Sequence, residues 1–176
     1  FRSRGLGDVY KRQLLDPGLA FGTGTHATTS LCLQWLDEHI HGGETLIDYG
    51  CGSGILALAA LKLGAQQVWA IDNDPQAMTA TKNNAKKNGV TTGLNIGSPE
   101  DPIPETVDIV VANILANPLL QLAPTFAKLL KPQGHIVLSG ILQDQAEHLL
   151  QRYSQWFCFD APRLQEDWAC LHGRKR

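Results

Sequence analysis

The chain has 176 residues, which suits a single domain, because chains divide into several hydrophobic cores only above roughly 250 residues. Hydrophobic residues make up 43% of the sequence and charged residues 18%, a balance that supports a buried core and excludes intrinsic disorder. The net charge of -2 gives no overall basic field for nucleic acid, and the sequence shows neither a signal peptide nor an apolar run of the roughly 20 residues that span a membrane.

The first thirteen residues differ in character from the rest of the chain. They are basic, lack clear periodicity and join abruptly to a patterned sequence at Leu14. The stretch from Asp8 to Gln13 also resembles the translation of a sequencing-library adapter, so we interpret residues 1–13 as a non-native leader. The predicted domain then covers residues 14–176, without internal repeats or linkers.

A glycine-rich loop, Gly22-Thr23-Gly24-Thr25-His26, precedes the first predicted helix, residues 28–39. Leu31, Trp35 and Leu36 recur at helical spacing and form an apolar face. We therefore expect this helix to cover another part of the fold.

From Thr45 onward, short apolar runs alternate with longer stretches of helical periodicity. The predicted strands are Thr45–Tyr49, Gln67–Ile71, Leu94–Gly97, residues 107–112 and, after a turn at residues 131–134, residues 135–139. The predicted helices are residues 54–63, a helix capped by Asp74 and ending at Asn88-Gly89, a helix from Asn117-Pro118 to Leu130, and Gln143–Tyr153. This alternation predicts a largely parallel sheet.

Two further strands, residues 156–159 and 167–171, close the chain without a helix between them. We expect them to pair as an antiparallel edge. The predicted fold is a doubly wound α/β domain whose mostly parallel seven-stranded sheet carries an antiparallel edge strand.

The strongest functional motif is the turn from Asp48 to Gly54, with the sequence Asp-Tyr-Gly-Cys-Gly-Ser-Gly. Glycines between a strand and a helix allow the backbone to bend tightly and to approach a nucleotide-like ligand. Gly50 and Gly52 fit the dinucleotide fingerprint, but Ile55 occupies the position of its third glycine. No Gly-Lys-Ser/Thr follows, so the turn is not a phosphate-binding P-loop, and a dehydrogenase is disfavoured.

Two polar residues at strand ends complete the predicted site. Asp72 ends the second strand, 22 positions after Gly50, where a carboxylate can accept hydrogen bonds from both hydroxyls of a ribose. Asn113 follows the fourth strand, where open α/β sheets form their ligand crevice. The structural alternatives are that the glycines only form a turn, that Asp72 only begins a helix and that Asn113 only caps a turn.

An Asp-x-Gly-x-Gly-x-Gly turn followed by an acid at the end of the second strand resembles the motifs of class I methyltransferases, which use S-adenosylmethionine. Together with the stretch from Leu15 to His26 and with Asn113-Ile114-Leu115-Ala116, this turn resembles the PrmA family, which methylates ribosomal protein L11 in bacteria. The resemblance extends from about Leu15 to Lys175.

The resemblance implies roles for single residues. Cofactor contacts are implied for Phe21, Thr29, Gly50, Gly52, Asp72 and Asn113. Asn113 and His26 are the expected catalytic residues, with a structural role of His26 in its loop as the alternative. Side-chain and backbone carbonyls at the position of Asn113 accept hydrogen bonds from the target amine in related enzymes. The absence of an aromatic residue after Asn113 favours an aliphatic amine over a flipped nucleobase.

The resemblance also implies a substrate. We expect methylation of lysine side chains and of the N-terminal amine of a large-subunit ribosomal protein, which the family captures with a separate N-terminal domain that we expect to be absent here. The alternatives are a methyltransferase for small molecules or nucleic acid, a nucleotide-dependent oxidoreductase, and an adenosyl-binding module without transfer activity.

The cysteines and histidines do not indicate a metal site. The four cysteines lie far apart, without a CxxC pair or a Cys/His cluster at zinc spacing, at Cys32, Cys51, Cys158 and Cys170. We therefore expect a reduced, cytoplasmic protein that holds no metal. We also expect a monomer that binds neither membranes nor nucleic acid directly.

Overall fold

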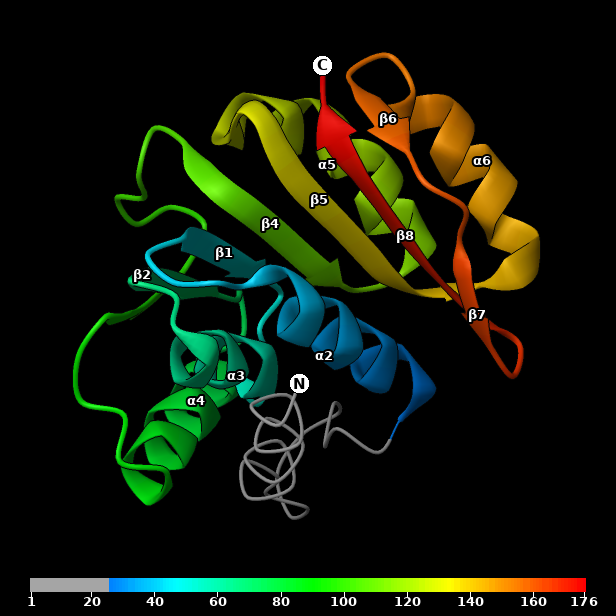
Figure 1. The fold of residues 1–176 in the computed structure, drawn as a ribbon. Coiled ribbons are helices and arrows are strands. Elements are labelled where there is room, and N and C mark those ends of the chain that lie inside the picture. The colour runs from blue at the N-terminus through cyan, green and yellow to red at the C-terminus, as the bar shows by residue number, and fades with distance from the viewer. Residues whose placement is uncertain (1–25) are drawn as a thin grey trace.

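A computed structural model describes residues 26–176 of the chain, which form a sheet between two layers of helices (Figure 1). The strands follow the order β3-β2-β1-β4-β5-β8-β6, and β7 pairs with β8 outside this path. Their bounds are β1 Thr45–Tyr49, β2 Gln67–Ile71, β3 Leu94–Gly97, β4 Val107–Asn113, β5 Leu130–Leu142, β6 Phe157–Phe159, β7 Arg163–Gln165 and β8 Trp168–Lys175.

The strand directions confirm the predicted doubly wound, mostly parallel sheet. Strands β1 to β5 are parallel to one another, whereas β8 is antiparallel to β5, β6 and β7. The antiparallel strand β8 lies between β5 and β6, so the edge strand on this side is β6. Strand β7 was not predicted, because it has only three residues and an exposed leucine, Leu164, at its centre.

Helices cover both faces of the sheet. One layer holds α2 (Ala27–His39), α3 (Ile55–Leu63) and α4 (Pro75–Lys87), and the other holds α5 (Ala116–Leu129) and α6 (Gln143–Tyr153). Successive strand residues face opposite layers, so Leu46 of β1 belongs to the core under α2 and α3 while Ile47 belongs to the core under α5 and α6. None of the helices in residues 26–176 has the length and apolarity of a transmembrane segment.

The start of α5 differs from the prediction of a cap at Asn117 and a first helical residue at Pro118. Leu115 is the N-cap, so Asn117 and Pro118 are the second and third residues of the helix. A proline is tolerated there because the first four N–H groups of a helix have no acceptor within it. The chain turns into α5 directly after β4, where the Ile114 N–H donates to the carbonyl of Ser139 at 3.2 Å.

Strand β5 is longer than the predicted strand of residues 135–139. Its pairing with β4 shifts from Val107 opposite Leu130 to Ile109 opposite His135, so the predicted turn of residues 131–134 forms an irregularity within the strand. Gln133 adopts a positive φ of 66° in this segment. The residues predicted to form a turn thus belong to β5, where the positive φ of Gln133 and the shifted register interrupt the regular pairing.

Candidate active site

The glycine turn after β1 requires glycine for steric reasons. Gly50, Gly52 and Gly54 all have positive φ angles, of 79°, 55° and 82°. A Cβ atom on Gly50 would collide with the Ile114 side chain, and one on Gly54 would lie 2.6 Å from the Thr81 methyl group. The turn is thus packed against α4 and the start of α5.

Two polar side chains of α4 donate hydrogen bonds to carbonyl groups of this turn. Thr81 Oγ1 donates to the Gly52 carbonyl at 3.2 Å, and Asn84 Nδ2 donates to the Ser53 carbonyl at 2.9 Å. Both side chains are buried, with exposed fractions of 0% and 2%. Neither residue was predicted as part of the site. Two polar residues three positions apart on the buried side of a helix could have indicated their role.

Asp72 connects the turn after β1 with the turn after β2. Its Oδ2 accepts the Gly52 N–H at 3.0 Å and its Oδ1 accepts the Asp74 N–H at 2.9 Å. Each carboxylate oxygen can accept more than one hydrogen bond. Asp72 therefore stabilises the glycine turn and retains capacity for hydroxyl donors of a ligand.

Asp48 is a buried carboxyl group below the glycine turn. Its exposed fraction is 1%, and its Oδ2 accepts the Ala57 N–H of α3 at 3.1 Å. Burial raises the pKa of Asp48 to about 7, the hydrogen bond from Ala57 opposes this shift, and the nearby charge of Asp72 adds to it. The protonation state of this carboxyl group therefore changes near neutral pH.

Covalent and metal chemistry find little support among these residues. Burial raises the pKa of Cys51 to about 12, which keeps its thiol protonated and unreactive at neutral pH. In the part of the chain that the structure describes, no group of three or more His, Cys, Asp or Glu side chains is arranged to hold a metal ion.

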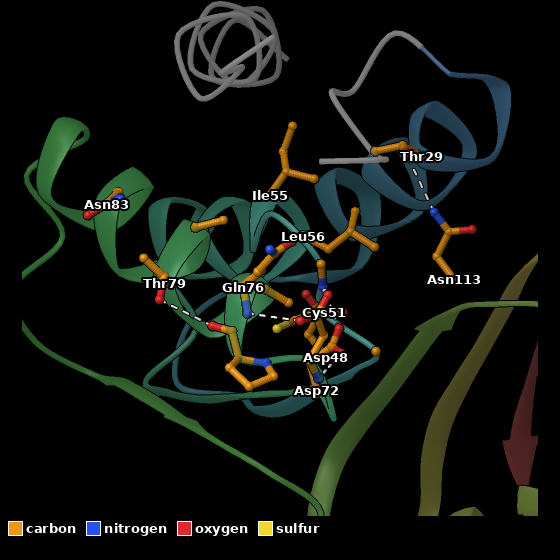
Figure 2. Close-up of a pocket in the computed structure, with 16 residues that line it drawn as sticks. Thr29, Asp48, Cys51, Ile55, Leu56, Asp72, Gln76, Thr79, Asn83 and Asn113 are labelled. Carbon is orange, nitrogen blue, oxygen red and sulfur yellow. Dashed lines mark hydrogen bonds between the residues drawn. The ribbon is translucent and has the colours of Figure 1, made fainter. Parts of the chain in front are cut away.

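Asn113 at the end of β4 meets Thr29 of α2, which lies 84 residues earlier in the chain. Asn113 Nδ2 donates to Thr29 Oγ1 at 3.3 Å, as Figure 2 shows. The carboxamide oxygen Oδ1 is buried and has no hydrogen-bond partner among residues 26–176. A buried acceptor without a partner costs free energy, so this oxygen is suited to a donor from a ligand.

Two adjoining cavities open at this edge of the sheet. The first cavity has a volume of about 670 Å³ and contains Asp48 and Thr29 together with residues of α3 and α4 (Figure 2). The second cavity, of about 520 Å³, is mainly apolar, with Tyr49, Ile114 and Trp168 in its wall. Gly50, Asp72 and Asn113 line both cavities. Each volume lies within the range of small-molecule sites, about 300–1,000 Å³.

Most of the predicted site residues lie together in this structure. The residues that line the first cavity include Thr29, Gly50, Gly52, Asp72 and Asn113. Phe21 lies outside the described residues. The predictions of their cofactor contacts remain predictions, since proximity alone does not assign a contact.

His26 lies beside the site instead of lining either cavity. It is the N-cap of α2, where its Nδ1 accepts the Thr28 N–H at 3.2 Å. Its ring stands edge-on to the ring of Trp168, with the centroids 5.1 Å apart. The structure therefore gives His26 a capping function, and its catalytic function stays a prediction.

Comparisons with known proteins agree with this geometry. A model of the family described as ribosomal protein L11 methyltransferase (PrmA) matches residues 11–176. A ribosomal protein L11 methyltransferase from Nitrosococcus oceani is 55% identical over 163 residues, which cover 93% of this chain and 56% of that protein. A ribosomal protein L11 methyltransferase from Tolumonas auensis is 57% identical over 164 residues, which again cover 93% of this chain and 56% of that protein. This chain thus spans a little over half the length of these curated relatives.

A solved structure shows the same architecture. The ribosomal protein L11 methylase from Lactobacillus delbrueckii subsp. bulgaricus superimposes with a TM-score of 0.81 at 37% sequence identity. The match covers 92% of this chain and 84% of that chain.

Proposed function

The chain belongs to the ribosomal protein L11 methyltransferase (PrmA) family, and on this basis we propose that it transfers methyl groups from S-adenosylmethionine to amino groups of ribosomal protein L11. The target amines are lysine side chains and the N-terminal amine, and the ribosomal substrate places the reaction in the cytoplasm. The observation that carries the proposal is the meeting of the glycine turn, Asp72 and the unpartnered Asn113 Oδ1 at one edge of the sheet.

The side chains around the two cavities suit an adenosyl ligand. Both oxygens of Asp72 can accept ribose hydroxyls in addition to the backbone N–H groups that they already bind. The apolar side chains in the wall of the first cavity, Ile55, Leu56 and Pro75, suit a flat adenine ring. S-adenosylmethionine supplies an electrophilic methyl group when it is bound. It has no pyrophosphate, which agrees with a turn that lacks a phosphate-binding motif.

The residues after β4 suit the target amine. A lysine amine has a pKa of about 10.4 in water and must lose its proton before it can act as a nucleophile. The Asn113 side-chain oxygen and the Ile114 carbonyl can accept its N–H groups and orient its lone pair. The apolar surroundings disfavour the charged form of the amine, so we infer that the proton leaves to water before the reaction.

Calorimetric titration with S-adenosylmethionine tests the cofactor assignment. We expect saturable binding by the chain, no binding of NAD, and an affinity at least about tenfold lower for Asp72→Ala, because hydrogen bonds to a charged group contribute about 1.5–3 kcal/mol. Asp108→Asn is the control: Asp108 also accepts hydrogen bonds from its surroundings, including the Thr45 N–H at 2.9 Å, but lies at the opposite end of β4. Equal affinities of the two variants would contradict the assignment.

Methyl transfer to purified ribosomal protein L11 tests the substrate. We expect labelled methyl groups on lysine side chains or on the N-terminal amine, located by mass spectrometry of proteolytic fragments. Transfer to RNA or to free metabolites in place of L11 would favour the alternative methyltransferases. Binding of the cofactor without transfer to any amine would identify an adenosyl-binding module.

A further inference from the structure

Gly140 lies at the carboxyl end of β5, directly behind the residues that follow β4. Its neighbour Ser139 pairs with Asn113 in the sheet, and Gly140 itself lines the second cavity. Its φ angle is +85°, so the chain leaves the regular strand geometry at this residue. A Cβ atom here would lie 2.6 Å from the Ile114 carbonyl oxygen, 2.9 Å from the Ile114 nitrogen and 3.0 Å from Asn113 Oδ1.

These distances show that two carbonyl oxygens converge on the space that a side chain would fill. One is Asn113 Oδ1, which is buried and has no hydrogen-bond partner in the described part of the chain, and the other is the backbone oxygen of Ile114. From the other side, Thr29 accepts the Asn113 Nδ2–H group and so fixes which end of the carboxamide faces Gly140. The Ile114 N–H donates to the Ser139 carbonyl, which ties the same peptide to β5.

We propose that Gly140 is a positioning residue for methyl transfer, because the absence of a side chain lets Asn113 Oδ1 and the Ile114 oxygen lie together as acceptors for the target amine. The inference rests on the proposed function. Gly140 does not touch the reacting atoms; it acts through the Asn113-Ile114 peptide. An alanine at this position moves that peptide, since the backbone atoms of Ile114 cannot rotate away as a flexible side chain can.

The positive φ angle of Gly140 also favours glycine, independently of the crowding. A control variant at another glycine with a similar φ angle separates the effect of backbone strain from the effect of crowding. Gly43, in the turn before β1, has a φ of +87°, and a Cβ atom there would meet nothing within 4 Å. Gly43→Ala and Gly140→Ala therefore introduce similar backbone strain, of about 1 kcal/mol. Only Gly140→Ala crowds the two acceptor oxygens.

The first readout needs no substrate. In nuclear magnetic resonance spectra of the labelled chain, Gly140→Ala is expected to shift the Asn113 carboxamide and the Ile114 amide signals and to speed hydrogen exchange of the Ile114 N–H. Gly43→Ala is expected to leave these signals in place. Unchanged Asn113 and Ile114 signals in Gly140→Ala would overturn the inference.

The second readout is transfer to ribosomal protein L11. We expect kcat of Gly140→Ala to fall by about 100-fold, as for a misplaced reacting group, while its Kd for S-adenosylmethionine rises by less than about tenfold relative to Gly43→Ala, because Asn113 is only one of several predicted cofactor contacts. Equal kcat values of the two variants, or a loss of cofactor affinity that matches the loss of kcat, would overturn it. A wild-type chain without any transfer contradicts the proposed function instead, and the nuclear magnetic resonance readout then decides on Gly140 alone.

A double variant separates positioning from a general defect in folding. In Asn113→Ala one of the two acceptors is gone, whereas the contacts of position 140 with the Ile114 backbone remain. The Gly140→Ala change is then expected to lower kcat by clearly less than about 100-fold, because only the Ile114 oxygen is left to be displaced. The same loss in both backgrounds would show a merely structural effect and would contradict the proposal.

Discussion

At the scale of single residues, two aspartates beside the glycine turn have different surroundings. Asp72 accepts two backbone N–H groups and lies at the mouth of both cavities. Asp48, the fourth residue of β1, is buried and accepts a hydrogen bond from the Ala57 N–H. Burial therefore dominates the titration of Asp48, and its raised pKa makes the stability of the fold depend on pH.

Asp48→Asn is expected to change this pH dependence. Because the pKa of Asp48 is raised to about 7, the folded state binds this proton more tightly than the unfolded state, so the contribution of Asp48 to stability is lost as pH rises from about 4 to about 7. The variant does not titrate, and its unfolding free energy relative to wild type should rise by about 2 kcal/mol between pH 5 and pH 8. Urea unfolding at both pH values measures this difference. A difference that is the same at pH 5 and pH 8 would show that Asp48 titrates normally.

At the scale of helices and strands, the site residues lie at the ends of these elements, so the contacts that hold those ends position the site. The glycine turn joins β1 to α3, and its carbonyls are held by α4, so three elements share one loop. The start of α5 has no side-chain cap, since Leu115 is its N-cap and is 72% exposed beside the second cavity. The start of α6 is better held, because Gln145 Oε1 accepts the Leu142 N–H at 2.9 Å.

Gln145→Ala is expected to lower the unfolding free energy by about 0.5–1 kcal/mol, because the Leu142 N–H at the N-terminus of α6 loses its acceptor. Gln151→Ala on the same helix is the control. Both glutamines are exposed, so the gain in helix propensity is the same in the two variants. Thermal or urea unfolding of both variants measures the difference, and an equal stability of the two would exclude a contribution from this hydrogen bond.

At the scale of the whole molecule, the site lies where the two helical layers meet the carboxyl ends of the parallel strands. Thr29 comes from one layer, Ile114 and Leu115 lead into the other, and Asp72 directly follows β2, which lies between the layers. The domain that we propose, residues 14–176, contains all of these segments together with Phe21. Residues 1–13 contribute no predicted contact.

Two shortened chains test this proposed domain. A chain that begins at Leu14 is expected to unfold at the same temperature as the whole chain and to bind S-adenosylmethionine with the same Kd. A chain that begins at Thr25 keeps the Thr29–Asn113 hydrogen bond but lacks Phe21, so its Kd is expected to rise at least about tenfold. Calorimetry measures both. Weaker binding by the chain that begins at Leu14 would show that residues 1–13 belong to the domain.

The sequence by itself determined the local elements and the family. Strand and helix bounds followed from periodicity, caps and glycines, because these signals act over a few residues, and β1, β2, β3 and α6 lie where they were predicted. The family that the motifs indicated is confirmed over residues 11–176. At the start of α5 the local signal at Asn117-Pro118 indicated the wrong residue, because the N-cap is Leu115, which has no capping side chain.

Only the tertiary structure decided which distant residues meet. The placement of β8 between β5 and β6, the contact of Thr29 with Asn113 and the convergence of two carbonyl oxygens on Gly140 all join segments from separate elements. No local pattern marks such pairs, because they arise from the packing of whole elements against one another. The sequence therefore indicated the candidate site residues, and the packing of the sheet and its two helical layers decided how those residues face each other.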